Sequence, residues 1–544
     1  MRKQTKIAAV VSAAALLALG ASITSFAASK GTWMLVDGEW YCYDKNGDVY
    51  ENTFCSSNGK EYYVGDDGMI VKSDWVEYDG SYYFVNSSGA KITNDWRLTT
   101  PYDDDDADEA WYYFQSTGKR AENKKIVYKG KTYFLDAEGK MLTGWVTADG
   151  TQVVNEENSI DKDDTYYCGE DGARIEGNWV YTTEPTAEDD EADADEYYYY
   201  LKPGNGRPVV NTKRNNVKGQ SYIFDEEGRM LWGWVAKTKA SDSSAVYEKI
   251  DEEEDTAVTL SDPDYSEVYY CSAEDDGHVK KNRWIKLWRP KNTYEEDEDV
   301  SKKWYWIEKD GKVYIPSARD VDGTSKAYKF EEGNILDDSD GEIKNITTKK
   351  ISSKDYYFNQ DGEMISGFQW LEFATGSNAT GMYYFGGSDD GSMKTGSQSI
   401  KDDNGDTYKF YFGTRTATSA VEETKGKGIT GNKSNKLYYD GMLIKAEDYK
   451  YQVVRMSIGG DPCQFIVNQN GSIQHANSEY KEDGDVLVSA KTVTKDGEKT
   501  YEVKFLNTKA DYVIENKKYS FNVVIGDLDN NVEPINARAY VYGE

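Results

Sequence analysis

The stretch that decides the fold reads Tyr82-Tyr83-Phe84-Val85-Asn86-Ser87-Ser88-Gly89-Ala90-Lys91-Ile92-Thr93-Asn94-Asp95-Trp96. It combines an aromatic strand, a polar turn closed by glycine, a short second strand and a tryptophan. A glycine between two strand-like runs is a strong hairpin signal, because glycine reaches positive φ without steric cost. The stretch therefore predicts a β-hairpin that turns at Gly89.

The same unit recurs along the chain at a fixed interval. Gly47, Gly68 and Gly89 follow one another at 21-residue spacings, and Gly118 and Gly139 repeat that spacing. A period in this range indicates a repeat architecture, in which thin cores are shared between neighbouring units. Apolar residues make up only 38% of the chain, which suits such a stack, and 14% aromatic residues argue against disorder. The predicted class is all-β, built from hairpin repeats.

The chain is predicted to have three segments: a signal peptide at 1–27, repeats at 28–474 and a C-terminal β element at 475–544. A basic head precedes an apolar run that ends in Ser25-Phe26-Ala27, the small-x-small pattern of a signal peptidase site. The run is too short to span a bilayer, which favours a cleaved leader over an anchor helix. No later stretch is apolar enough for a membrane span.

The last segment is predicted to be a small antiparallel β cap on the open end of the repeats. Apolar and polar residues largely alternate in four runs, which is the period of half-exposed strands. These runs are Val486–Val488, Tyr501–Phe505, Tyr519–Val524 and Ala539–Tyr542.

The chain is strongly acidic, with 64 basic and 97 acidic side chains and a net charge of −33. Such a surface repels nucleic acid and anionic membranes and favours neutral or cationic partners. Acidic loop insertions interrupt the period at Asp103–Asp106, Glu188–Glu196, Asp251–Asp255 and Glu295–Asp299. They are interpreted as solvated loops, with calcium binding as the alternative. None has ordered ligand spacing, so no metal site and no cofactor are predicted.

Two copies of the repeat carry a resemblance to a known family. They run from Gly130 to Trp145 and from Gly219 to Trp234, with the order Gly, aromatic strand, turn, Gly-x-Met and Gly-Trp. This order resembles the choline-binding-type, or cell-wall-binding, repeats of Gram-positive surface proteins and glucan-binding modules. With interruptions, the resemblance covers roughly residues 31 to 474.

The resemblance implies a β-solenoid in which ligands sit in aromatic cages between consecutive hairpins. Such a cage takes a quaternary ammonium group by cation–π attraction or a sugar ring by stacking, and for each aromatic a place in the core is the alternative. Asp74, Asp95 and Arg283 replace the glycine before the cage tryptophan, which weakens the choline version. The implied ligand-binding residues are Trp75, Trp96, Trp145, Trp179, Trp234, Trp284 and Phe368, with hairpin partners Tyr63, Tyr83, Phe134, Tyr167 and Phe224.

No catalytic site is predicted, because the repeats leave little room for a separate catalytic domain. The only histidines are His278 and His475. His278 follows a turn glycine, and His475 with Cys463 lacks a third orienting group. Paired carboxylates for glycoside hydrolysis stay open among 97 acids, but no pair stands out.

The sequence therefore predicts a secreted, non-catalytic protein of the cell surface that binds cell-wall polymer, choline-substituted or neutral, or another glycan. The alternative is a structural or adhesive protein with degenerate cages, whose acidic loops bind calcium or a partner. The oligomeric state stays open.

Overall fold

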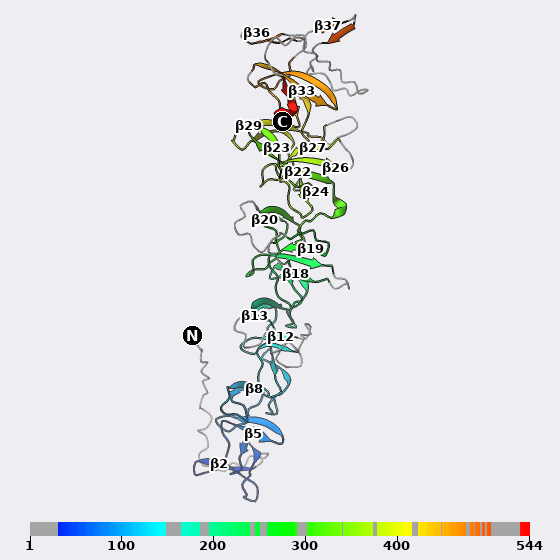
Figure 1. Cartoon of the computed structure of the whole chain (residues 1–544). Coiled ribbons are helices and arrows are strands. Elements are labelled where there is room, and N and C mark those ends of the chain that lie inside the picture. The colour runs from blue at the N-terminus through cyan, green and yellow to red at the C-terminus, as the bar shows by residue number, and fades with distance from the viewer. Residues whose placement is uncertain are drawn as a thin grey trace. The chain divides into compact units, whose positions relative to one another are not determined.

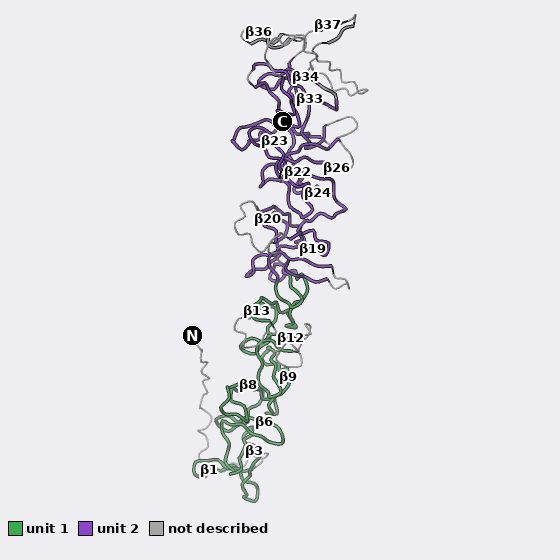
Figure 2. Tube along the Cα trace, viewed as in Figure 1, with its two compact units in different colours: residues 1–214, 223–230 green, residues 215–222, 231–544 purple. Residues whose placement is uncertain are grey.

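The structure is a computed structural model, and it forms two compact units (Figures 1 and 2). Unit 1 comprises residues 1–214 and 223–230, and unit 2 comprises residues 215–222 and 231–544. The described residues are 31–147, 165–184, 195–239, 245–250, 258–290, 302–339, 341–373, 378–415, 423–447, 449–474, 479–482, 485–489, 492–495, 498–501 and 534–544. The predicted signal peptide, most of the acidic runs, His475 and Tyr519–Val524 lie outside them.

Unit 1 is a succession of two-stranded antiparallel hairpins, each made of consecutive strands. Its strands are β1 (Thr32–Val36), β2 (Glu39–Tyr43), β3 (Thr53–Ser57), β4 (Lys60–Val64), β5 (Asp74–Tyr78), β6 (Ser81–Val85), β7 (Asp95–Thr99), β8 (Ala110–Phe114), β9 (Lys124–Tyr128), β10 (Lys131–Leu135), β11 (Gly144–Thr147), β12 (Thr165–Cys168), β13 (Asn178–Thr183) and β14 (Glu196–Leu201). β15 (Thr212–Val217) and β16 (Gln220–Phe224) lie where the chain is divided.

The aromatic strand of the Tyr82–Trp96 stretch, β6, pairs mainly with the strand before it. β6 pairs with β5 through the tight turn Asp79–Gly80, where φ is 50° and 63°. Two central residues at positive φ match the right-handed twist of the flanking strands. The predicted pairing across Gly89 is reduced to one bridge, Val85 with Lys91. The hairpin repeat is thus confirmed, but the predicted pairing partner is wrong.

The Gly89 turn instead joins one hairpin to the previous one. The Asn86 side chain accepts hydrogen bonds from the backbone N–H groups of Ser88 (2.9 Å) and Ala90 (3.0 Å), which holds the turn closed. The Lys91 N–H then donates to the Glu61 carbonyl at 2.8 Å, on the preceding hairpin. Arg120 to Tyr82 and Met141 to Trp111 repeat this bond at 2.7 and 2.8 Å. The second residue after each turn glycine therefore links consecutive hairpins.

The turn glycines are needed for space as well as for φ. A Cβ at Gly139 would lie 2.8 Å from the Ala121 carbonyl oxygen and 2.9 Å from Cδ of Arg120, on the preceding turn. Gly130 has the same φ of 80°, but a Cβ there meets nothing within 4 Å. A substitution at Gly130 therefore reports backbone strain alone, whereas one at Gly139 reports strain and steric contact together.

We expect Gly139→Ala to destabilise the protein more than Gly130→Ala, by about 1–3 kcal/mol. Both substitutions carry the cost of positive φ, about 1–2 kcal/mol, so their difference reports the contact with Ala121 and Arg120. Urea unfolding of the two variants measures it. Equal destabilisation would show that the neighbouring turn yields without cost.

Unit 2 continues the hairpins and then forms wider sheets. Its elements are β17 (Trp234–Thr238), β18 (Tyr247–Lys249), β19 (Tyr265–Tyr270), β20 (Arg283–Leu287), β21 (Lys303–Ile307), the 3-10 turn η2 (Ala318–Asp320), β22 (Gly323–Glu331), β23 (Asn334–Asp337), β24 (Lys344–Ile351), β25 (Lys354–Asn359), β26 (Phe368–Phe373), β27 (Gly381–Tyr384), β28 (Gly396–Lys401), β29 (Thr407–Phe412), β30 (Gly431–Lys433), β31 (Lys436–Tyr439), β32 (Met442–Leu443), β33 (Tyr451–Ile458), β34 (Asp461–Asn468), β35 (Glu479–Glu482), β36 (Asp485–Ser489), β37 (Thr492–Lys495), β38 (Glu498–Tyr501), β39 (Ile535–Asn536) and α1 (Ala537–Tyr542).

Two larger sheets carry much of the core of unit 2 (Figure 1). One runs in the order β25–β24–β22–β26–β27, with β23 beside β22, and the other runs β28–β29–β32–β31–β30. Phe368, Phe410 and Phe412 are at most 2% exposed in the core cluster that these sheets share with β33 and β34. In the C-terminal part, β35 pairs with β36 and β37 with β38, consistent with the predicted small β element.

The predicted strand at Ala539–Tyr542 is wrong, because these residues belong to the helix α1. Asn536 caps its start by accepting from the Arg538 N–H (3.0 Å), and Gly543 ends it at a φ of 67°. Ala537 and Val541, four residues apart, are fully buried against the core of the sheets. Tertiary burial of one face thus selects a helix where the alternation of residue types suggested a strand.

Candidate functional site

The predicted site tryptophans and Phe368 all hold one position, on the first strand of a hairpin and opposite an aromatic residue of the second strand. This register follows from the alternation of side chains along antiparallel strands. The opposed residues are Trp75 with Phe84, Trp96 with Tyr113, Trp145 with Tyr167, Trp179 with Tyr200, Trp234 with Tyr270, Trp284 with Trp306 and Phe368 with Tyr384.

Each of these rings also packs against an aromatic ring further along the chain, from a later hairpin or strand. The distances between ring centroids are 4.9 Å for Trp75–Tyr112, 5.1 Å for Trp96–Tyr133, 5.0 Å for Trp145–Tyr199, 5.7 Å for Trp179–Phe224, 5.1 Å for Trp234–Tyr305, 4.9 Å for Trp284–Tyr356 and 5.2 Å for Phe368–Phe410. The structure therefore brings the predicted residues together between hairpins. Their role toward a ligand stays a prediction.

The remaining predicted partners, Tyr63, Tyr83 and Phe134, also lie in aromatic contacts. Tyr63 and Tyr83 each place their ring 5.1 Å from Phe54, and Phe134 stacks on Tyr166 at 5.2 Å. Phe54 takes the place of the tryptophan in its hairpin and was missed by the sequence reasoning. Its signal was the period itself, because it precedes Trp75 by 21 residues.

Burial divides the site tryptophans into two groups. Trp75, Trp145 and Trp234 are less than a tenth exposed. Their indole N–H groups donate to the backbone carbonyls of Thr100 (2.8 Å), Thr183 (3.1 Å) and Trp288 (2.9 Å). A buried indole N–H needs such a partner.

The three acceptor residues occupy one place in the repeat. Each lies four residues after the tryptophan of a later hairpin, Trp96, Trp179 or Trp284, and each precedes an acidic insertion. The buried tryptophans therefore anchor the start of these insertions and pack as core residues. The later tryptophans are only half-buried.

Each hairpin with a half-buried tryptophan also carries an exposed aromatic side chain. Trp111 on β8 is 43% exposed, Tyr181 on β13 is 52% exposed, and Trp288 after β20 is 40% exposed. Aromatic side chains are enriched in binding interfaces relative to the rest of the surface. The sequence reasoning missed these three residues, because exposure is set by the neighbouring hairpins.

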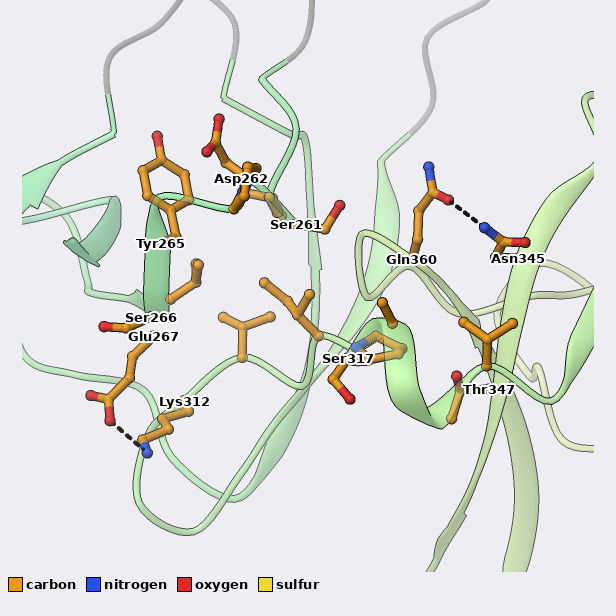
Figure 3. Close-up of a pocket in the computed structure, with 18 of the residues that line it drawn as sticks. Ser261, Asp262, Tyr265, Ser266, Glu267, Lys312, Ser317, Asn345, Thr347 and Gln360 are labelled. Atoms are coloured by element: carbon orange, nitrogen blue, oxygen red, sulfur yellow. Dashed lines mark hydrogen bonds and ion pairs between the residues drawn. The ribbon is translucent and has the colours of Figure 1, made fainter. Parts of the chain in front are cut away.

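Unit 2 also contains a cavity of about 730 Å³ between β19, the segment 312–321 and β24 (Figure 3). Leu260, Val268 and Val313 form part of an apolar wall, while Tyr265 and an ion pair between Glu267 and Lys312 (2.7 Å) lie at the rim. Such a volume is typical of small-ligand sites. The cavity could not be predicted from the sequence, because its lining comes from segments far apart in the chain.

Glu267 in this cavity is unsuited to donate a proton at neutral pH. Burial raises the pKa of its carboxyl, but hydrogen bonds from Lys312 and Tyr269 outweigh burial and hold the pKa below its ordinary value. A general acid needs a pKa near the working pH. Glu267 therefore does not suit the role of a general acid in this cavity.

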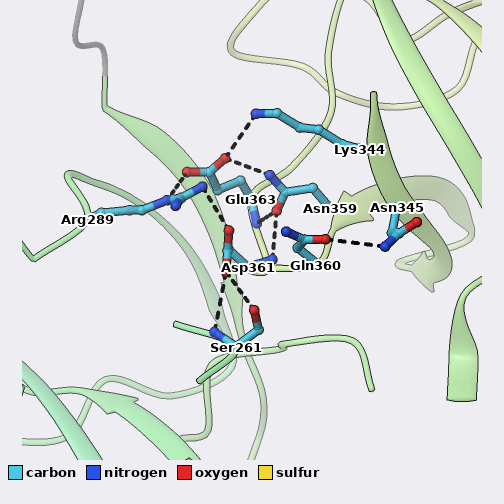
Figure 4. Close-up of polar contacts among 8 residues, drawn as sticks. All are labelled: Ser261, Arg289, Lys344, Asn345, Asn359, Gln360, Asp361 and Glu363. Atoms are coloured by element: carbon cyan, nitrogen blue, oxygen red, sulfur yellow. Dashed lines mark hydrogen bonds and ion pairs between the residues drawn. The ribbon is translucent and has the colours of Figure 1, made fainter. Parts of the chain in front are cut away.

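A buried charged cluster lies beside the cavity (Figure 4). Arg289 contacts Asp361 at 2.9 Å and Glu363 at 2.6 Å. Asn359 donates to Glu363 at 2.7 Å, and the Ser261 hydroxyl donates to Asp361 at 2.8 Å. The Arg289 guanidinium pairs with both carboxylates, and Ser261 bonds to one of them. The cluster therefore holds together the loops that carry these residues.

The remaining candidates for chemistry were the histidines and the acidic runs. The Nδ1 of His278 lies 2.6 Å from an oxygen of Asp276, and its Nε2 lies 3.1 Å from Nζ of Lys280. Among the described residues, no group of three His, Cys, Asp or Glu side chains is placed to hold a metal ion. Asp103–Asp106 is exposed to solvent. Among the residues that the structure describes, no helix is long and apolar enough to cross a membrane.

Comparison with known proteins gives partial likenesses. No family model matches the chain. It is 23% identical over 402 residues to glucosyltransferase-I of Streptococcus downei, a match that spans 60% of this chain and 23% of that enzyme. The chain thus corresponds to less than a quarter of that relative.

Similar solved structures come from Streptococcus pneumoniae. The choline-binding domain of CbpL is 26% identical, with 37% of this chain and 96% of that chain covered and a TM-score of 0.17. Choline binding protein F is 18% identical, with 78% and 98% covered and a TM-score of 0.18. The modular autolysin LytC, in complex with a synthetic peptidoglycan ligand, is 16% identical, with 61% and 52% covered and a TM-score of 0.32. By its repeat and its antiparallel hairpins, this chain is similar to the choline-binding-type repeat proteins of Gram-positive surfaces.

Proposed function

We propose that this chain is a non-catalytic module of a bacterial cell surface that binds a cell-wall polymer or another glycan. The observation that carries the proposal is the recurring pair of a half-buried tryptophan and an exposed aromatic on one hairpin. The pairs are Trp96 with Trp111, Trp179 with Tyr181, and Trp284 with Trp288.

Sugar rings present C–H groups that stack on aromatic faces. For the energy of each contact we take the value for a pair of aromatic rings, about 0.5–1.5 kcal/mol beyond area burial. Single contacts of this size are weak, but repeated contacts along one polymer reinforce one another. The net charge of −33 repels phosphate-rich polymers, which favours neutral sugars or choline substituents. The names of the similar proteins, which include choline-binding domains and an autolysin with a peptidoglycan ligand, agree with this class of partner.

The proposal predicts that the chain sediments with purified Gram-positive cell walls. The test variant combines Trp111→Ala, Tyr181→Ala and Trp288→Ala, which remove exposed rings and leave the backbone acceptor of Trp234 in place. We expect its affinity for walls to fall about tenfold or more. The matched control is Val127→Ala with Ile343→Ala, which removes exposed aliphatic groups at 68% and 71% exposure.

Two additions separate the ligand classes. Pelleting that excess choline abolishes indicates choline substituents, and pelleting that ignores choline indicates sugar stacking. Pelleting abolished by EDTA instead favours the alternative of an adhesive protein with calcium-binding acidic loops. Absence of pelleting, or equal pelleting by the aromatic variant, contradicts the proposal.

A further inference from the structure

One repeat position in unit 1 carries cations where other copies carry apolar side chains. The position is the second residue after the turn glycine, and its side chain lies beneath the glycine of a following turn. Lys91 lies beneath Gly118, Arg120 beneath Gly139 and Arg174 beneath Gly206, as Met141 lies beneath Gly172. The cations and the methionine are therefore structural equivalents.

The Arg120 guanidinium lies over three aromatic rings. Its Cζ is 4.4 Å from the ring centroid of Tyr82, 5.5 Å from that of Trp75 and 5.9 Å from that of Tyr112. Two of these rings belong to the inter-hairpin contact described above. Contact with several electron-rich faces is the geometry by which aromatic sites hold cations.

Lys91 and Arg174 repeat the arrangement with fewer rings. Nζ of Lys91 lies 4.8 Å from the ring centroid of Phe54 and 5.4 Å from that of Tyr83. The Arg174 guanidinium lies 5.1 Å from the ring centroid of Tyr166, which stacks on Phe134. Predicted ligand-binding aromatics are thus in contact with cations of the chain itself.

The three cations are buried and neutralised. Their side chains are only 9%, 10% and 8% exposed, and each pairs with one glutamate, Lys91 with Glu61, Arg120 with Glu122 and Arg174 with Glu176. A buried cation is tolerated only when charge partners compensate its lost hydration. Ring faces and carboxylates together provide that compensation and keep the cation in place.

We propose that Lys91, Arg120 and Arg174 are built-in cationic ligands of the aromatic sites of unit 1, so that these sites exclude quaternary ammonium groups. The inference rests on the proposed function and narrows its ligand class. The inter-hairpin sites at these three positions are filled, and unit 1 binds neutral sugar on its outward aromatic faces. Copies with methionine at the same position lack the internal cation.

The test is equilibrium dialysis of the full chain with labelled choline, without cell walls. Arg120→Met places in this copy the side chain that Met141 has in another. Tyr82 is half-buried and Tyr102 is 38% exposed beside it, so the ring faces that lose the cation border solvent. We expect Arg120→Met to bind one more choline per chain than the unaltered protein, with an affinity at the new site at least about tenfold above that of an exposed ring.

Three further variants make the result decisive. Arg120→Lys keeps a cation over the rings and is expected to bind no extra choline. Lys119→Met removes an exposed neighbouring charge and is expected to change nothing. Lys91→Met repeats the test at a second site, in case Arg120→Met loses its fold by near-ultraviolet circular dichroism.

An extra choline bound by Arg120→Lys, or none bound by folded Arg120→Met and Lys91→Met, overturns the inference. Because no wall is present, either result leaves the wall-pelleting test of the proposed function unaffected.

Discussion

Replacing Trp234 with alanine is expected to lower the free energy of unfolding of unit 2 by about 3–5 kcal/mol. The indole ring is 8% exposed and packs at 5.2 Å on Tyr270 and at 5.1 Å on Tyr305. Its N–H is bonded to the Trp288 carbonyl at 2.9 Å. The substitution leaves a large void between two hairpins and removes the hydrogen bond to the Trp288 carbonyl. Urea unfolding followed by circular dichroism measures the loss.

Two further variants show how much of the loss of stability comes from the buried ring and how much from its hydrogen bond. Trp288→Ala removes a 40%-exposed ring but keeps the backbone acceptor, and it is expected to cost less than about 1 kcal/mol. Trp234→Phe keeps most of the apolar volume and loses the hydrogen bond, for an intermediate cost of about 1–3 kcal/mol. If Trp234→Ala proved as mild as Trp288→Ala, the ring would not be a core element, and its predicted ligand role would gain weight.

Replacing Arg289 with methionine is expected to destabilise unit 2 by about 3–5 kcal/mol at neutral pH, because it leaves buried carboxylates without their cation. Asp361 and Glu363 have side chains that are only 5% and 7% exposed, and Arg289 contacts both. Methionine keeps much of the length and volume of arginine, so the change isolates the charge. A matched control is Arg538→Met, whose ion pair with Glu544 is more than half exposed and worth at most about 1 kcal/mol.

The same substitution is expected to reverse the pH dependence that comes from Glu363. Burial by itself raises the pKa of this carboxyl, but hydrogen bonding and charge from Arg289, with support from Lys344 and Asn359, hold the pKa below its ordinary value of 4.5. In the unaltered protein, this stabilisation is complete above pH 4.5 and is lost as the pH falls through the lower folded-state pKa. Without Arg289, burial dominates and raises the pKa.

The folded variant then binds a proton at Glu363 more tightly than the unfolded chain does. Its stability is expected to decrease as the pH rises above about 4.5, where the contribution of Glu363 in the unaltered protein is constant. Urea unfolding of both proteins across about pH 4 to 7 shows the difference, which is largest at the upper end. Parallel pH profiles for the two proteins would contradict the assignment of Arg289 as the group that keeps Glu363 ionised.

Local chemistry explains why the repeat could be predicted. A glycine that needs positive φ, an Asn or Asp that bonds the backbone two and four residues on, and aromatic strands of fixed length all act within one hairpin, as around Asn86 and Gly89. The pairing partner of the aromatic strand was harder to predict. Both Asp79–Gly80 and Asn86–Gly89 offer good turns, and only the stacking of hairpins assigns the first to the hairpin and the second to the link.

The positions of the candidate aromatics could be predicted from the sequence but their individual burial could not, and their role toward a ligand stays a prediction. The spacing of the predicted aromatics matches the position that they hold between hairpins, and Phe54 was missed although it precedes Trp75 by the same 21 residues. Whether a ring is buried depends on a carbonyl from a later hairpin, as for Trp234 and Trp288. Whether an aromatic site holds an internal cation depends on the reach of a side chain such as Arg120 from a neighbouring turn.

The sequence by itself determined the repeat and the all-β hairpins, because these follow from interactions a few residues apart, and the family resemblance implied the aromatic layers between the hairpins. Only the tertiary structure decided the helix at Ala537–Tyr542, where burial of Ala537 and Val541 overrides the alternating pattern. It also decided which tryptophans are core and which have accessible faces, and that cations of the chain lie against the rings near Trp75. These features arise from contacts between separate hairpins, and a pattern read along one hairpin does not contain them.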